Sequence, residues 1–272
     1  MKAASILLTT FLTLAGTPAL AQTKSGVEKL YIINCGEGVA GDLSRWTPGL
    51  NVGTQKDFVD NCYLIKHGPD WFLWDTGVTD AVAAMPQGQP PADPRAVTWK
   101  KPVTLAGELE KLGVKPGDIK YLAVSHTHPD HIGNVELFPQ AMLLTQKAEY
   151  EWPSPFGPRF KAEHPVTKLE GDRDVFGDGS VVILSTPGHT PGHQSLLVNL
   201  PKTGALVLSG DAVHFRDNFD ARRVPAINDN ADKTLASMQR IADVMTKEHA
   251  QLWINHDKAQ RDTLKLAPDF YE

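Results

Sequence analysis

Four potential metal ligands lie within a span of six residues in the stretch Ser125-His126-Thr127-His128-Pro129-Asp130-His131-Ile132-Gly133-Asn134. The apolar run Tyr121-Leu122-Ala123-Val124 precedes it and predicts a buried strand. Residues two apart in an extended chain share a face, so the first two histidines are expected to converge on one ion. The Asp130-His131 pair begins the next predicted helix and turns toward a second ion. The pattern therefore predicts a metal pair rather than surface histidines, because imidazoles and carboxylates at this density have no packing purpose.

The spacing of this pattern, His126-x-His128-x-Asp130-His131 followed by Gly133, resembles the signature of the metallo-β-lactamase superfamily. That family completes its metal site with a further histidine, a bridging aspartate and a last histidine. The resemblance implies that His189, Asp211 and His256 fill these roles. Each of the three follows an apolar run that predicts a strand, at residues 181–185, 205–208 and 252–255.

The resemblance also implies how the metals are shared. One ion is expected on His126, His128 and His189, the other on Asp130, His131 and His256, with Asp211 as the bridge. Two divalent ions bring four positive charges and two carboxylates remove two, so the site favours a developing oxyanion. Water activated by the metals is the expected nucleophile. Zinc suits these ligands, although manganese, iron or cobalt would also be accepted.

The substrate class is suggested by the residues around Asp211. The Gly210-Asp211-Ala212 context resembles that of N-acyl-homoserine lactonases, which implies hydrolysis of such lactones or related ones. In those enzymes a tyrosine three residues after the bridging aspartate polarises the substrate or protonates the leaving oxygen. His214 stands at that position here, and imidazole can do both. Asp130 and His214 are therefore the expected catalytic residues.

Other activities of the superfamily fit less well. Its β-lactamases lack a bridging aspartate at the position of Asp211. A glyoxalase II continues well past its last ligand, whereas sixteen residues follow His256 here. Ribonuclease Z acts on RNA, which an acidic exported chain suits poorly. Hydrolysis of other esters, thioesters or β-lactams, and a metal-binding or lactone-binding protein without turnover, remain as alternatives.

The fold implied by the resemblance is an α/β, four-layer αββα sandwich, with two mixed sheets packed together and helices outside. Helices are expected over residues 103–112 and from Ile132 to Phe138. A later amphipathic helix should bury Leu235, Met238, Ile241 and Met245. Three irregular stretches are expected at residues 36–60, 85–102 and 150–160. The first and third either frame a pocket or form surface loops.

Residues near the ligands are expected to support them. The turn Asp75-Thr76-Gly77 resembles the superfamily's aspartate-bearing turn beneath the metals, so Asp75 is expected to orient a ligand loop, an ordinary turn aspartate being the alternative. His193 is expected to brace the loop of His189. The remaining histidines lie in no motif and are expected at the surface or in caps: His67, His164 and His249.

The N-terminus has the order of a secretory signal peptide. Lys2 precedes an apolar stretch, and Ala19-Leu20-Ala21 follows as a cleavage site, so residues 1–21 are expected to be removed and residues 22–272 to form one domain. The chain has 27 basic and 32 acidic residues and a net charge of −5; without Lys2 it becomes −6. A periplasmic or secreted protein is expected, with no membrane span after processing and no nucleic-acid partner. Its oligomeric state is open.

Two cysteines, Cys35 and Cys62, complete the composition. Export permits a disulfide between them. Two buried free thiols are nevertheless the favoured expectation, since both residues lie next to predicted strands and nothing in their spacing requires a bond.

Overall fold

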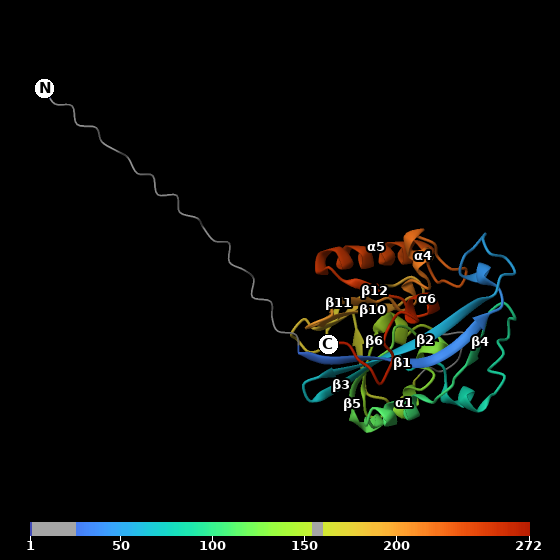
Figure 1. Cartoon of the computed structure of the whole chain (residues 1–272), viewed down its shortest axis with the longest axis horizontal. Coiled ribbons are helices and arrows are strands. Elements are labelled where there is room, and N and C mark those ends of the chain that lie inside the picture. Colours follow the sequence, from blue (N-terminus) through green and yellow to red (C-terminus); the bar gives the residue numbers. More distant parts are fainter. Residues whose placement is uncertain (2–25, 154–159) are drawn as a thin grey trace.

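Two sheets form the centre of the molecule in a computed structural model that describes residue 1 and residues 26–153 and 160–272 (Figure 1). The seven-stranded sheet has the order β4-β1-β2-β3-β5-β6-β7, with bounds Val27–Ala40 (β1), Lys56–His67 (β2), Asp70–Trp74 (β3), Val97–Lys100 (β4), Ile119–Ala123 (β5), Met142–Gln146 (β6) and Val166–Leu169 (β7). The five-stranded sheet has the order β12-β11-β10-β9-β8, with bounds Arg173–Asp174 (β8), Val181–Ser185 (β9), Gln194–Leu200 (β10), Gly204–Leu208 (β11) and Gln251–Trp253 (β12).

Helices lie on the outer faces of this pair of sheets, with α5 over the five-stranded sheet and α1 beyond the seven-stranded one (Figure 1). The α-helices are Leu105–Lys111 (α1), Pro129–Ile132 (α2), Lys147–Tyr150 (α3), Arg216–Asp220 (α4), Ala231–Glu248 (α5) and Lys258–Arg261 (α6). Short 3-10 helices span Leu43–Arg45 (η1), Asp80–Ala84 (η2), Pro116–Asp118 (η3), Val135–Leu137 (η4) and Gly210–Ala212 (η5). The expected αββα sandwich is confirmed.

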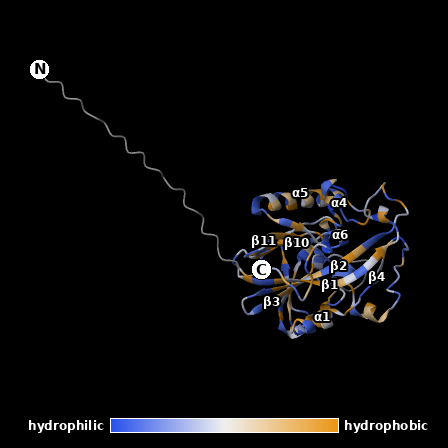
Figure 2. Ribbon diagram, in the orientation of Figure 1, coloured by the Kyte–Doolittle hydropathy of each residue, from blue (hydrophilic) through white to orange (hydrophobic). Residues whose placement is uncertain are grey.

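Three apolar clusters hold the layers together. The largest lies between the sheets and includes Phe72 and Trp74 from one and Leu196 and Leu208 from the other. A second packs α1 against the seven-stranded sheet, and a third packs α5 against the five-stranded sheet. In Figure 2, α5 carries both hydrophobic and hydrophilic residues, as expected for a helix buried on one side. Met238 and Ile241 are buried as predicted and Met245 is partly buried, whereas the prediction was wrong at Leu235, which is 37% exposed.

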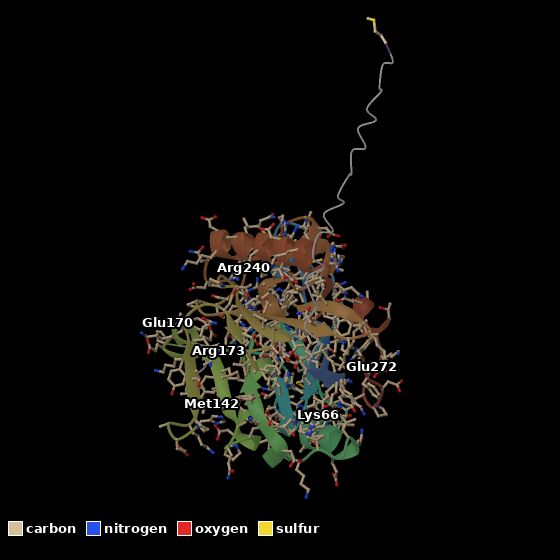
Figure 3. All side chains as sticks on the ribbon, turned by 90° about the vertical axis from the view of Figure 1, so that its left-hand side faces the viewer. Lys66, Met142, Glu170, Arg173, Arg240 and Glu272 are labelled. Carbon is tan, nitrogen blue, oxygen red and sulfur yellow. A yellow bond between two sulfur atoms is a disulfide. The ribbon has the colours of Figure 1, made fainter. Side chains whose placement is uncertain are left out.

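A polar contact also joins α5 to the five-stranded sheet. Figure 3 shows Arg240 on α5, above the five-stranded sheet, whereas Met142 and Lys66 belong to the seven-stranded sheet below it. Arg240 Nη1 donates to the Ser185 carbonyl at 2.7 Å. This contact holds the end of β9, from which the loop of His189 departs.

Two of the expected loops are shorter than predicted. β1 continues to Ala40 and β2 begins at Lys56, so the first irregular stretch is confined to residues 41–55, and β4 occupies part of residues 85–102. The glycines of this stretch disguised the strand. A side chain at Gly38 would lie 2.4 Å from Val97 Cγ1, so glycine is what lets β4 pair closely with β1. The helix expected from Ile132 to Phe138 is two short turns, α2 and η4.

The expectation of free thiols was wrong. Cys35 and Cys62 form a disulfide, with Cα atoms 5.8 Å apart. Cys62 pairs with Ile33 in the β1–β2 ladder, and a bulge between Asn34 and Gly36 inserts Cys35 as the extra residue. A strand pattern read from sequence reveals neither this register nor the bulge.

Two expectations concern residues that the structure leaves undescribed. The expected signal peptide lies outside the described residues except for Met1, as does the part of the aromatic segment at residues 154–159. Over the described ranges, none of the helices has the length and apolar character that a bilayer crossing requires.

Candidate metal centre

The ligand residues converge at one end of the sandwich, where the strands deliver their following loops. The loop after β5 carries His126 and His128, and α2 carries Asp130 and His131. The loop between β9 and β10 carries His189, η5 carries Asp211, and the turn after β12 carries His256. Main-chain bonds align these loops: Gln194 N donates to Ser125 O at 2.8 Å, and Ser209 N donates to Trp253 O at 3.0 Å. The end of one sheet is thereby tied to the end of the other.

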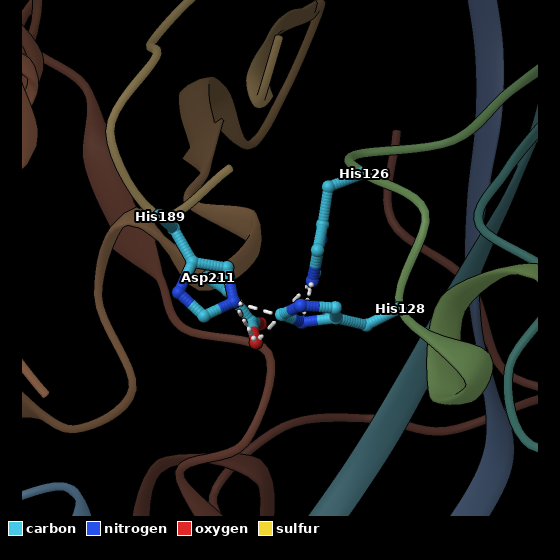
Figure 4. A group of neighbouring side chains, drawn as sticks. All are labelled: His126, His128, His189 and Asp211. Atoms are coloured by element: carbon cyan, nitrogen blue, oxygen red, sulfur yellow. Dashed lines mark hydrogen bonds and ion pairs between the residues drawn. The ribbon is translucent and has the colours of Figure 1, made fainter. Parts of the chain in front are cut away.

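The first ligand group is formed by three histidines. His126 Nε2 and His189 Nε2 lie 2.9 and 3.0 Å from His128 Nδ1, so three ring nitrogens face one point (Figure 4). Asp211 Oδ2 lies 3.7 Å from His126 Nε2 and 3.4 Å from His189 Nε2. One donor atom from each of these four residues lies within 4.8 Å of the others. The structure thus brings together the group expected from the sequence.

The second ligand group contains Asp130, His131 and His256, whose donor atoms also lie within 4.8 Å of one another. Asp211 reaches this group with its other oxygen: Oδ1 lies 3.4 Å from His131 Nε2 and 3.0 Å from His256 Nε2. The Asp211 carboxylate therefore lies between the two groups, with one oxygen toward each. This is the position expected of a bridge.

The outer ring nitrogens of the second group are fixed by partners. His131 Nδ1 lies 3.0 Å from Asp75 Oδ2, and Ser125 N donates to Asp75 Oδ1 at 2.6 Å. His256 Nδ1 lies 2.7 Å from the Val59 carbonyl oxygen. Such contacts hold the proton on Nδ1 and aim Nε2 at Asp211. The contacts expected of Asp75, to a ligand and its loop, are present.

His193 and His214 flank Asp211. His193 Nε2 accepts a hydrogen bond from Asp211 N at 2.9 Å, and its Nδ1 lies 3.0 Å from the Thr186 carbonyl oxygen. His193 thus supports the start of the loop of His189, as expected, and it also supports Asp211, which was not expected. His214 Nε2 lies 3.1 Å from Asp211 Oδ2, and the ring is 3% exposed. Asp211, His214 and His256 form a third set with donors within 4.8 Å.

The two ligand groups differ in the pKa values of their histidines. Burial lowers the pKa of His126 and His189 well below the ordinary value, and nearby imidazoles lower it further; burial also lowers the pKa of His128. Burial opposes protonation of His256 too, but the charge of Asp211 outweighs it and raises the pKa to about 9. The pKa of His131 is likewise raised, against burial, by Asp211 and Asp75.

These donors fit divalent metal ions. Three ring nitrogens of the first group cannot all be paired with one another, because each neutral-ring nitrogen offers one proton or one lone pair. In the second group, His131 Nε2 and Asp211 Oδ1 are buried and, although they lie 3.4 Å apart, neither makes a hydrogen bond of suitable geometry within the described residues. Buried polar atoms are normally satisfied, so these atoms indicate a missing partner. Imidazole nitrogen and carboxylate oxygen together suit zinc and similar ions.

Several supporting residues were not found from the sequence. Glu149 contacts both histidine-bearing loops of the first group. Asn255 Nδ2 donates to Asp60 Oδ1 at 3.1 Å, and Asn61 Nδ2 donates to Asn255 O at 2.8 Å, which holds the turn before His256. Burial raises the pKa of Asp60 to about 6. Glu149, Asp60 and Asn61 lie far in sequence from the residues that they support, and no motif marks them.

The remaining histidines were predicted with mixed success. His249 ends α5 in the left-handed conformation, as a cap. His67 pairs with Asp178 at 2.9 Å at the surface. His164 was expected at the surface or in a cap and is buried instead, with Nε2 3.1 Å from the Ala141 carbonyl oxygen.

Comparison with known proteins places this site in a family. Residues 56–247 match the model of the metallo-beta-lactamase superfamily. An N-acyl homoserine lactonase of Bacillus cereus is 30% identical over 257 residues, which cover 90% of this chain and 99% of that protein. One of Agrobacterium fabrum is 31% identical over 227 residues, covering 77% and 86%.

A solved N-acyl homoserine lactone hydrolase is similar in structure, with a TM-score of 0.77, 27% identity and coverage of 90% of this chain and 99% of that one. It carries the product N-hexanoyl-L-homoserine at its catalytic metal center. The residues that match the family model include all the proposed ligands except His256. This chain belongs to the metallo-beta-lactamase superfamily.

Proposed function

We propose that this protein is a lactonase that opens N-acyl homoserine lactones or closely related lactones. Its family and its cluster of histidines and aspartates make it a metal-dependent hydrolase. The observation that carries the narrower proposal is the complete set of seven donors at one end of a chain that is about 30% identical to lactonases over nearly its whole length. The superfamily alone would allow many other hydrolyses.

We assign two metal ions, zinc being the best fit to the donors, to the two ligand groups. His126, His128 and His189 would hold one, Asp130, His131 and His256 the other, and Asp211 would bridge them. When bound, such ions activate water and polarise the lactone carbonyl. The protein's own contribution is to keep the donors in place. Asp75 and the Val59 carbonyl hold the rings of His131 and His256, and His193 holds the backbone of Asp211.

The proposal gives Asp130 and His214 the roles nearest the reaction. Asp130 is half-buried, whereas His131 and His256 of the same ligand group are buried, so Asp130 is the most exposed member of that group. His214 presents Nε2 to the same Asp211 oxygen that faces the first group, at 3.1 Å. A proton on this nitrogen is within reach of an oxygen that develops charge beside Asp211, so His214 would polarise the carbonyl or protonate the leaving oxygen.

Aromatic rings on both sides of the site suit an acyl substituent. Trp152 lies 6.4 Å from the ring of His128, and Trp99 lies 5.9 Å from the ring of His256. Both are partly exposed. Apolar walls beside a polar centre are typical of sites for small amphipathic molecules.

A substrate screen tests the proposal. Metal-loaded protein is assayed against acyl-homoserine lactones of several chain lengths, other lactones, aryl esters, thioesters and β-lactams. We expect kcat/KM for at least one lactone to exceed that for every thioester and β-lactam by more than about tenfold, a difference of about 1.4 kcal/mol in transition-state binding. Preferred turnover of a thioester or β-lactam would contradict the proposal. Binding of a lactone without turnover would favour a non-catalytic protein.

We also propose export to the periplasm or medium, with cleavage after Ala21. Two features support it: the charged, apolar and small-residue order of residues 1–21, and the Cys35–Cys62 disulfide, which suits an oxidising compartment. Mass spectrometry of protein from the cell envelope and medium is expected to find a chain that begins at Gln22. A cytoplasmic chain that keeps Met1 would refute the proposal.

A further inference from the structure

A buried carboxylate outside the ligand set joins two of the ligand loops. Glu149 lies in α3 and is 0% exposed. Its Oε1 accepts hydrogen bonds from Thr127 N at 2.8 Å and Thr127 Oγ1 at 2.6 Å. Its Oε2 accepts from Thr190 Oγ1 at 2.7 Å and Gly192 N at 3.0 Å. Each oxygen thus serves one backbone N–H and one hydroxyl, from a different loop on each side.

The contacted residues stand next to ligands. Thr127 lies between His126 and His128, and Thr190 directly follows His189. The approach is close as well: a side chain at Gly192 would lie 2.2 Å from Glu149 N, so only glycine admits α3 here. The carboxylate of Glu149 therefore fixes the backbone on which all three histidines of the first ligand group stand.

We propose that Glu149 is a positioning residue that sets the metal affinity of His126, His128 and His189. The inference rests on the proposed function, because it requires a metal at this group. Without Glu149 the two loops lose their shared acceptor, and the three ring nitrogens are no longer held facing one point. Partners behind metal ligands typically contribute 10- to 100-fold to metal affinity. The second ligand group has other supports, Asp75 and the Val59 carbonyl.

A carboxylate is required at this position, not merely a polar side chain. Both oxygens accept from backbone N–H groups, Thr127 N on one side and Gly192 N on the other. Glutamine has one acceptor oxygen, so its amide nitrogen would face one of these donors. A hydroxyl can turn and accept instead, but a backbone N–H cannot. Glu149→Gln therefore leaves a buried N–H unpaired while it changes volume very little.

The test compares Glu149→Gln with Glu151→Gln in the full mature chain. Glu151 is a matched control, since it caps the same helix but is exposed and pairs with Lys168 at 3.1 Å. Zinc and cobalt affinities of the metal-free proteins are measured by competition with a coloured chelator, and ions per chain by elemental analysis. Glu149→Gln is expected to lower the affinity for one of the two ions by about 10- to 100-fold and to leave the affinity for the other within about threefold of wild type. Glu151→Gln is expected to match wild type.

A second pair of variants covers the case in which Glu149→Gln does not fold. Thr190→Val removes one hydroxyl at nearly constant volume, and Thr190→Ser restores it. The valine variant should lower the affinity for the same ion by a smaller factor, and the serine variant should bind that ion with wild-type affinity. Unchanged affinities in Glu149→Gln, or equal weakening of both ions, would overturn the inference. A wild-type chain that binds no metal would instead refute the proposed function, which keeps the two failures distinct.

Discussion

The two ligand groups of the site are held in different ways. The first, His126, His128 and His189, comes from two loops that a single buried carboxylate joins from behind, at their backbones. In the second group, His131 and His256 are held directly at their rings, by Asp75 and by the Val59 carbonyl. Backbone support fixes where a loop lies, and ring support fixes which nitrogen faces the metal.

The groups also differ in charge. Burial lowers the pKa of all three imidazoles of the first group, whereas Asp211 raises the pKa of His131 and His256. Neutral imidazole is ready to bind a metal, and a protonated ring must release its proton first. Asp211 directs one carboxylate oxygen to each group, so the comparison depends strongly on it.

The largest effect is expected from Asp211→Ala. This change removes one carboxylate oxygen from each group and the negative charge that both share. We expect loss of at least one metal ion per chain and a fall of lactone hydrolysis of about a thousandfold or more. Elemental analysis and steady-state kinetics on the same sample provide the check. Full activity in this variant would contradict the proposed bridging role of Asp211.

The next effect is expected from His214→Ala. His214 contacts Asp211 but is proposed to serve the substrate, so both metals should remain while kcat/KM falls by roughly ten- to ten-thousand-fold. His214→Tyr should recover part of that loss, because a phenol also bears a proton. Wild-type kinetics in the alanine variant would make His214 structural. Loss of a metal would make it a ligand, through the set it forms with Asp211 and His256.

A smaller and selective effect is expected from Asp75→Asn. The amide keeps one acceptor for two donors, Ser125 N and His131 Nδ1, so the ring of His131 loses its charged partner. We expect the second group to bind its ion about 10- to 100-fold more weakly, and the first, whose loops Glu149 still joins, to be affected less. Chelator competition is the measurement. Because Glu149→Gln should give the opposite selectivity, the same response in both variants would show that the two groups are not held separately.

The smallest effect on the site is expected from replacing both cysteines by serine. The disulfide joins the paired strands β1 and β2 across a sequence separation of 27 residues. Its loss should lower the free energy of unfolding by about 3 kcal/mol, chiefly because the unfolded chain becomes less restricted. Denaturant unfolding of the metal-loaded protein measures this. A changed number of metal ions per chain would show that the disulfide supports the ligands as well.

Whether a residue could be predicted from the sequence depends on how far along the chain it lies from the residues that it contacts. His126, His128, Asp130 and His131 are adjacent to a clear apolar run, so local spacing and a family resemblance were enough to find them. The expected fold followed from the same resemblance. The structure brings His189, Asp211 and His256 to the same place, as that resemblance implied.

The residues that were missed act across the fold. Glu149 lies 22 positions from Thr127 and 41 from Thr190, and Asp60 lies 195 from Asn255, so no local pattern joins them. The bulge that brings Cys35 to Cys62 depends on strand register, and the pairing of β4 with β1 depends on the close approach at Gly38. Register and close approach are set by packing, which periodicity does not report.

The most direct test of the account is to count metal ions and follow lactone hydrolysis in the same titration. Mature protein is stripped with a chelator, zinc is returned in steps, and activity is plotted against ions bound per chain. We predict negligible hydrolysis of an acyl-homoserine lactone by the stripped protein, and full activity only when close to two ions per chain are bound. Full activity with one ion or none would contradict the two-metal site on which the account depends.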